Sequence, residues 1–209
     1  MADETAVRSA IADERRTLAA VLASLTPEQW EAPSLCAGWR VREVVAHITM
    51  AFRYSMPQVV LEMLRSRGKF DAMADRTARR DAARLSTAEL IANIADSVDH
   101  AWKPPGGGYV GALSHDLIHG LDITVALGLD RRVPLERVRM VVGNLQPRQV
   151  KFFGVDLDGV QLRASDTAWT FGSGEPLVGS AQDLLLVLCG RKLPAGQLEG
   201  PASGRFSQP

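Results

Sequence analysis

The chain has 209 residues, of which 46% are hydrophobic and 23% charged, the composition of an ordinary globular protein. Lysine plus arginine and aspartate plus glutamate both number 24, so the formal net charge is zero. This balance argues against a protein built to coat nucleic acid or an anionic membrane. We therefore expect no nucleic acid and no membrane among its partners.

The sequence also shows no pattern typical of a secreted or membrane-spanning chain. The first 24 residues carry charges of both signs and do not form a signal peptide pattern. The longest purely apolar run, LLLVLC at 184–189, is far too short to span a bilayer. Cys36 and Cys189 could form one disulfide, but two reduced thiols fit better. We expect a cytoplasmic protein.

Four long helices are expected from apolar residues at helical spacing and from the capping patterns around them. The first covers 4–24, and TPEQ at 26–29 opens a short helical turn through a capping box. The second covers 39–60 with a kink or an interruption near Pro57. The third runs from STAE at 86–89 to the prolines at 104–105, and the fourth runs from about 110 to 127. Residues 65–84, which show little apolar periodicity, are expected to be an exposed helix-and-loop connection.

These helices predict a mainly α fold, with a four-helix bundle over 1–145. Residues 146–209 differ in character and predict a small α+β domain. Asp-Gly turns and alternating residues in 150–174 indicate two or three strands. A last helix is expected after Ser180, with Asp183 in its first turn and its end at Gly190.

Two histidines share one side of the fourth helix, in the stretch GALSHDLIHGLDI at 111–123. At about 100° per residue, His115 and His119 lie about 40° apart and about 6 Å along the axis, so both rings reach one point. The helix is apolar almost all round, which predicts that it is buried. Asp122, three residues beyond His119, could orient that imidazole or cap a neighbouring group.

A third histidine is expected to point inward from the second helix. His47 lies in VVAHI beside the apolar stripe of that helix. Three neutral imidazoles from two helices would leave one or more coordination positions open, as catalytic metal sites do. Buried histidines are also often simple hydrogen-bonded core residues, and the spacing alone leaves both interpretations open. His100 is expected at the surface or near a helix C-terminus.

For three other features of the sequence, a structural role is favoured over a functional one. Cys36 could be a nucleophile, but packing or capping is favoured because no histidine is near it in sequence. Trp39 is expected to pack at the start of the second helix against the first, with lining of the pocket as the alternative. The arginine-rich stretch 65–84 carries interleaved aspartates, which favours a solvated face over a nucleic-acid or phosphate site. It could still supply cations for an anionic substrate at the pocket mouth.

Three motifs together resemble the mycothiol-dependent maleylpyruvate isomerase family, a branch of the DinB-like superfamily. SLCAGWRVREVVAHI (34–48) is similar to the signature that opens the second helix in that family. LSHDLIHGLDITVALG (113–128) resembles its E-x-x-x-H-G-x-D-x-A-x-A-L-G stretch. GSAQDLLLVLCGR (179–191) is similar to a motif near the end of its C-terminal domain. The resemblance covers nearly the whole chain, in order.

The resemblance implies a DinB-like four-helix bundle that binds a divalent metal, most often zinc, through His47, His115 and His119. The isomerase has glutamate at the position of His115, whereas other DinB-like proteins use three histidines. Metal binding is therefore implied, and the isomerase reaction itself is not. Zinc is expected, with nickel, iron and copper as alternatives, since imidazole suits them all. The resemblance further implies mycothiol as thiol cosubstrate and Arg191 as a catalytic residue of the C-terminal domain.

We thus expect a metal-dependent enzyme in which the metal activates a low-molecular-weight thiol as a thiolate for S-transfer or isomerisation of a small electrophile. A metal-dependent hydrolase on the same site is the alternative enzyme. A DinB-like scaffold that binds a small molecule or a protein is the non-catalytic alternative. The expected partners are the thiol and the substrate, and the protein itself is expected to be a monomer or homodimer.

Overall fold

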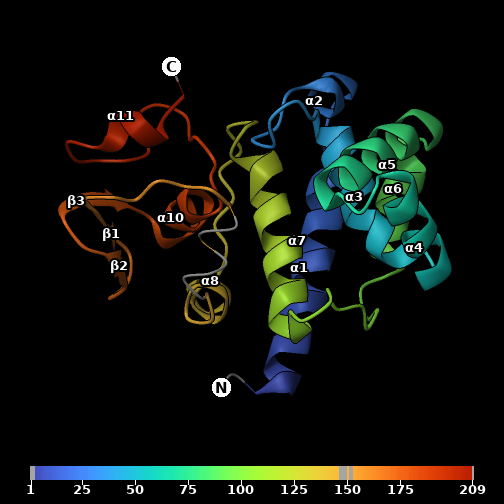
Figure 1. The fold of residues 1–209 in the computed structure, drawn as a ribbon, viewed down its shortest axis with the longest axis horizontal. Coiled ribbons are helices and arrows are strands. Elements are labelled where there is room, and N and C mark those ends of the chain that lie inside the picture. The colour runs from blue at the N-terminus through green and yellow to red at the C-terminus, as the bar shows by residue number, and fades with distance from the viewer. Residues whose placement is uncertain (1–2, 146–149, 151–152, 209) are drawn as a thin grey trace. The chain divides into compact units, whose positions relative to one another are not determined.

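The computed structural model describes residues 3–145, 150 and 153–208. The chain falls into two compact units, Met1–Gly120 and Leu121–Pro209, which divide within helix α7 (Gly108–Thr124) (Figure 1). The sequence analysis placed the boundary between the two domains at residue 145. The structure divides the chain earlier, because helix α8 (Leu135–Val142) packs with α10 (Ala181–Leu188) in the second unit. Whether each unit folds as a domain of its own stays a prediction.

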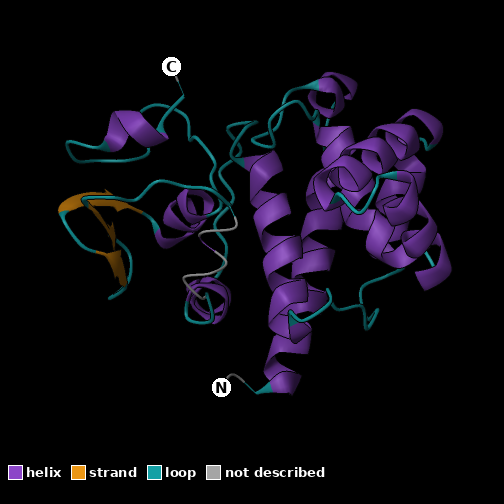
Figure 2. Ribbon diagram, in the orientation of Figure 1, coloured by secondary structure: helices purple, strands orange, loops and turns teal. Residues whose placement is uncertain are grey.

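The helices and strands of the described part of the first unit are all helices, joined by loops (Figure 2), and the first two are α1 (Glu4–Ala23) and α2 (Pro27–Glu31). The carboxylate of Asp3 caps α1 by accepting from the backbone N–H of Thr5. Thr26 and Gln29 form the predicted capping box of α2, with Pro27 in its first turn. The buried side of α1 contains Leu18 and Leu22, so the amphipathic helix predicted over 4–24 is confirmed.

The predicted interruption of the second helix is confirmed just before Pro57. Helix α3 (Val41–Arg53) ends at Tyr54, and α4 (Met56–Arg65) begins after Ser55. Proline is accommodated in the first turn of a helix, where its missing N–H is not needed, but not in a helix interior. Pro57 therefore marks the beginning of a new helix rather than a kink in the old one.

The helix and loop expected over 65–84 are present, but the expectation that they are exposed is wrong for one side of the helix. Residues Phe70–Arg84 form helix α5, which packs along α3. Its buried side consists mainly of small residues: Met73, Ala74, Thr77, Ala78, Asp81 and Ala82. Alanines give a weak hydrophobic signal in a sequence, yet they let two helices approach closely. The buried Thr77 hydroxyl is satisfied by the carbonyl oxygen of Met73, at 2.8 Å.

Helix α6 (Thr87–Ala95) opens at the predicted Ser86 cap but ends earlier than expected. Arg15 of α1 donates to the carbonyl oxygens of Ser97 and His100, at 2.9 and 2.8 Å, which fixes the chain in a turn there. Helix α7 lies against α1 through the Arg15–Asp116 ion pair and against α3 through the contacts of His47 with His115 and His119. The mainly α fold predicted for the chain is confirmed. Within the described part of the chain, no helix has the length and apolar character needed to cross a bilayer.

The second unit contains a three-stranded sheet and the remaining helices. Strand β1 (Val160–Ala164) lies between β2 (Thr170–Gly172), to which it is antiparallel, and β3 (Glu175–Gly179), to which it is parallel. The third strand lies beyond the predicted range 150–174. Helix α10 carries the predicted apolar run and is capped by Ser180, while α11 (Ser203–Phe206) is a single turn near the end.

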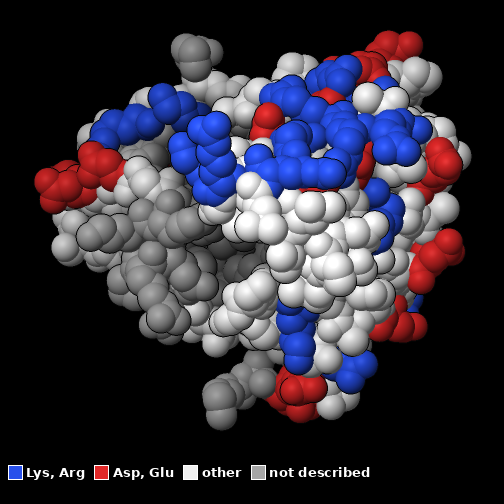
Figure 3. Space-filling model, turned by 45° about the vertical axis from the view of Figure 1, so that its right-hand side comes forward, with Lys and Arg blue, Asp and Glu red and all other residues white. Residues whose placement is uncertain are grey.

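Glu62 holds α4 against α5 in the first unit. Its side chain is only 6% exposed and receives ion pairs from Arg65, Arg76 and Arg80. Figure 3 shows lysine and arginine side chains gathering on the surface with a few carboxylates between them. Burial by itself would raise the pKa of Glu62, but the guanidinium groups, with that of Arg80 foremost, hold this pKa below its usual range.

We predict that Glu62→Gln lowers the free energy of unfolding by about 1–2 kcal/mol at pH 7, because the anion that the arginines surround is lost. A carboxylate with a lowered pKa stabilises the fold above its unfolded-state pKa, and this contribution is lost as pH falls through the folded-state pKa. The difference between wild type and variant should therefore shrink in acid. Urea unfolding between pH 7 and pH 3 measures it, with the exposed Glu175→Gln as control; a difference that does not depend on pH would contradict the prediction.

Candidate functional site

Helix α3 directs His47 into the bundle. The residues around it, Val44, Val45 and Ile48, are fully buried, and His47 itself is 7% exposed. The sequence places this histidine on the same side of the helix as its apolar stripe, so burial of the stripe carries the ring inward. The predicted inward orientation of His47 is confirmed.

Helix α7 supplies two further imidazoles on consecutive turns. His115 and His119 are half-buried, while their neighbours Leu113 and Leu117 are fully buried. The four-residue spacing brings both rings to the same side of the helix, as the periodicity predicted. The site is thus closed on the side of the core and reaches solvent beside the α7 histidines.

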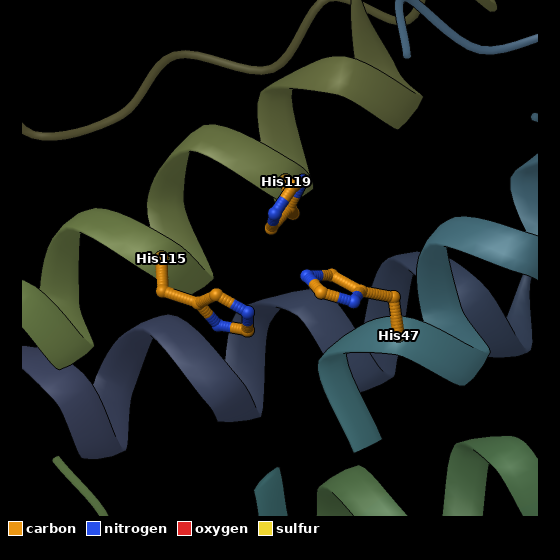
Figure 4. Close-up of side chains that lie close together, drawn as sticks. All are labelled: His47, His115 and His119. Atoms are coloured by element: carbon orange, nitrogen blue, oxygen red, sulfur yellow. The ribbon is translucent and has the colours of Figure 1, made fainter. Parts of the chain in front are cut away.

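The three rings point toward one another (Figure 4). One nitrogen from each of His47, His115 and His119 lies within 4.8 Å of the others. The ring centroid of His47 is 5.2 Å from that of His115 and 4.9 Å from that of His119, and the two α7 rings are 4.9 Å apart. Three imidazoles bound to one zinc ion at 2.0–2.1 Å have nitrogens about 3.4 Å apart. Shifts of about 1 Å would bring this trio to that spacing, so the donor set fits a divalent transition metal.

A buried ion pair lies next to His115. The Nδ1 atom of His115 lies 3.1 Å from Oδ1 of Asp116, whose other oxygen accepts from Nε of Arg15 at 2.7 Å. The side chains of Asp116 and Arg15 are fully buried. In metal-binding histidines the second ring nitrogen usually donates a hydrogen bond, through its N–H, to such a carboxylate. This hydrogen bond fixes the tautomer and the orientation of the ring. The arrangement leaves Nε2 of His115 for the centre of the trio.

Sequence analysis missed Asp116 and Arg15, although a signal was present. A carboxylate in the middle of an apolar helix must be paired when it is buried, because an isolated charge is costly there. Asp116 follows a histidine directly and lies in such a helix. Its partner on α1 could not be chosen from the sequence, since that chain segment carries several arginines.

The loop between α2 and α3 contributes two side chains that sequence analysis had assigned to packing. Sγ of Cys36 lies 3.8 Å from Nδ1 of His119, although no histidine is near it in sequence. The ring of Trp39 lies 5.2 Å from that of His47 and is held by a bond from its Nε1 to Asp75, at 2.8 Å. For Trp39 the pocket-lining alternative is therefore the better interpretation.

Both cysteines are thiols in the structure, in line with the expectation of reduced cysteines. They differ in their surroundings. Cys36 is half-buried, whereas Cys189 is 2% exposed at the end of α10. Burial raises the pKa of the Cys189 thiol to about 12. Cys189 is thus an unreactive core thiol, and only Cys36 lies at the histidine site.

On the other side of the trio, the connection between α6 and α7 supplies an indole. The ring of Trp102 lies 5.2 Å from that of His115. His100 is exposed, as predicted, and its ring packs against Phe52 rather than joining the trio. Trp39 and Trp102 thus flank the histidines from two different connections of the first unit.

The remaining two predicted site residues meet in the second unit. Arg191 donates to both carboxylate oxygens of Asp122, each at 2.8 Å, and to the carbonyl oxygen of Cys189. Asp122 is fully buried and the Arg191 side chain is 17% exposed. This pairing gives both residues a structural role. The predicted functions, orientation of His119 by Asp122 and substrate handling by Arg191, stay predictions.

Comparison with known proteins identifies the first unit. Residues 11–103 match the family model of the mycothiol maleylpyruvate isomerase N-terminal domain. The first unit therefore resembles this domain family over most of its length. The family predicted from the motifs is confirmed over these residues, which include His47 but not the α7 histidines. No curated protein matches the chain.

Two solved structures resemble the whole chain in fold. One is the crystal structure of the mycothiol-dependent maleylpyruvate isomerase, with a TM-score of 0.59, and the other is a histidine-to-alanine mutant of that enzyme, with a TM-score of 0.57. Each is 12% identical in sequence, over 99% of this chain and 95% of the other. At this identity the likeness shows the fold, so the maleylpyruvate isomerase fold extends through the second unit.

We predict that Asp116→Asn weakens metal binding about tenfold to a hundredfold, because the amide no longer fixes the tautomer of His115 as the carboxylate does. Because Arg15 keeps a buried charge without its counter-ion, the free energy of unfolding should also fall, by about 3 kcal/mol. Competition of a chelator for zinc at a temperature where the variant stays folded measures the affinity. The exposed Asp99→Asn is the control. Unchanged zinc affinity in a folded Asp116→Asn protein would contradict the assigned role.

Proposed function

We propose that this protein is a metal-dependent, thiol-dependent transferase or isomerase that acts on a small electrophile. The convergence of three imidazoles in the first unit is the observation that carries the proposal. Their one-sided exposure supports an open centre, since His47 is buried and the α7 histidines are half-buried. The match of residues 11–103 to the maleylpyruvate isomerase N-terminal domain family supports the choice of reaction class.

A divalent ion held by neutral imidazoles alone would keep its full +2 charge, and in that state it stabilises a bound thiol as the thiolate. The protein's own part is to hold the three histidines in place. Asp116 and Arg15 hold His115 in place through contacts that need no metal. The proposed donor set of His47, His115 and His119 carries no negative charge. An uncharged donor set favours formation of the thiolate.

The indoles beside the trio define the chemical character of the site. Trp39 and Trp102 present apolar ring surface next to His47 and His115. Apolar walls exclude water from a centre and strengthen the electrostatic interactions inside it. This supports a small substrate with an apolar or unsaturated part, brought next to the thiol.

The finer assignments are part of the same proposal. We assign zinc as the metal, since three nitrogen ligands with an open position are typical of catalytic zinc sites. Mycothiol is the proposed thiol, on the strength of the family match. Arg191 is the proposed substrate-handling residue of the C-terminal region, and Asp122 the proposed orienting group of His119. A cytoplasmic location agrees with the use of a small thiol.

We predict that His47→Ala and His119→Ala each reduce bound zinc from one ion per chain to less than a tenth and lower thiol conjugation at least a hundredfold, because two imidazoles hold zinc poorly. Elemental analysis and a conjugation assay with a model thiol and electrophile measure both. The matched control is His100→Ala, which removes the fourth histidine without touching the trio.

Three results would contradict the proposal in different ways. Wild type without stoichiometric metal would favour a binding scaffold. Tight metal without thiol turnover, but with cleavage of an ester or amide, would favour a hydrolase. Equal loss in His100→Ala and His119→Ala would show that the effect is not specific to the trio.

A further inference from the structure

Cys36 is placed against a ligand histidine by a firmly held loop. Its backbone N–H donates to Oγ of Ser34 at 3.1 Å, and its carbonyl oxygen accepts from the N–H of Trp39 at 3.0 Å. Arg79 of α5 donates to the carbonyl oxygen of Gly38 at 2.9 Å, which ties the tip of the loop to the bundle. The contact between Sγ of Cys36 and Nδ1 of His119, at 3.8 Å, is therefore fixed by the fold.

The identity of the contacted nitrogen is informative. An imidazole that binds a metal through one nitrogen carries its proton on the other. On His115 the Nδ1 atom faces the Asp116 carboxylate, and on His119 the same atom faces a sulfur. Both α7 histidines thus have a partner at Nδ1, which leaves Nε2 of each ring as the metal-binding atom.

We propose that Cys36 is a positioning residue that accepts a hydrogen bond from Nδ1–H of His119 and thereby presents Nε2 of that ring to the metal. The proposal rests on the proposed metal-dependent function. A distance of 3.8 Å lies within the range of hydrogen bonds to sulfur, whose lone pairs are more diffuse than those of oxygen. The contact differs from that of a metal ligand, because a sulfur on the Nδ1 side of the ring lies away from an ion bound at Nε2.

Asp122 is the other group that could act at the same nitrogen, since it lies three residues beyond His119 on α7. Its carboxylate already accepts two hydrogen bonds from Arg191, each at 2.8 Å. That pairing satisfies much of its charge and hydrogen-bonding capacity. Comparison of Cys36 and Asp122 variants therefore decides which of the two residues fixes the tautomer and the orientation of the His119 ring.

The first test uses the metal-free protein and long-range nitrogen–proton NMR spectra of the histidine rings. In wild type at pH 8 we expect His119 as the Nδ1–H tautomer. In Cys36→Val, which fills the space of the cysteine side chain but removes the sulfur acceptor, we expect a shift of at least a third of the population toward the Nε2–H tautomer. Unchanged tautomers in Cys36→Val, together with a shift in Asp122→Asn, would overturn the proposal in favour of the carboxylate.

The second test measures zinc affinity by competition with a chelator. Loss of an outer partner of a ligand histidine weakens binding about tenfold to a hundredfold, and we expect this for both Cys36→Val and Cys36→Ala. Cys189→Ala, which removes the other thiol, should bind zinc like wild type. If Cys36→Val bound zinc like wild type while only Cys36→Ala lost affinity, Cys36 would act by filling space, and the proposal would fall.

A third measurement separates positioning from direct coordination. Cobalt-substituted wild type should show no sulfur-to-cobalt charge-transfer band near 300–350 nm, and a band that disappears in Cys36→Val would overturn the proposal. The NMR test is independent of the proposed function, because it needs no metal and no activity. A protein that shows the predicted tautomers but binds no metal would refute the function and leave the contact of Cys36 with His119 established.

Discussion

The first unit is organised around one buried ion pair, Arg15 with Asp116. Arg15 comes from α1 and Asp116 from α7, and neither side chain is exposed. The guanidinium also fixes the turn after α6 by binding two of its carbonyl oxygens. A single cation therefore connects three helices of the bundle. Removing either partner would leave an uncompensated charge in the core, which costs far more than an exposed ion pair contributes.

The same ion pair links the fold to the chemistry. Asp116 faces Arg15 with one oxygen and His115 with the other, so its orientation is set before any ligand arrives. The third histidine comes from α3, where burial of the valines and Ile48 sets its direction. The trio thus depends on packing and on a paired charge, and the loop that carries Cys36 and Trp39 closes around it. Preorganisation of this kind is what a catalytic metal centre requires.

Much of this could be predicted from the sequence, and the limits have physical reasons. The periodicity of the helix containing His115 and His119 predicted their common side, and the position of His47 beside an apolar stripe predicted its burial. The buried side of helix α5 was missed, because it is built mainly from small residues rather than large apolar ones. The partners of Asp116 and Cys36 could not be chosen from the sequence, since Arg15 and His119 lie 101 and 83 residues away along the chain. Contacts at such separations depend on the fold and have no local signal.

The position of the trio on two helices has a thermodynamic consequence. An ion shared by His47 of α3 and the two histidines of α7 would bridge elements that are distant in the chain and would bind the unfolded chain far less well. Mass action then makes resistance to denaturation depend on the concentration of free metal, rising by about 1.4 kcal/mol for each tenfold excess over the dissociation constant.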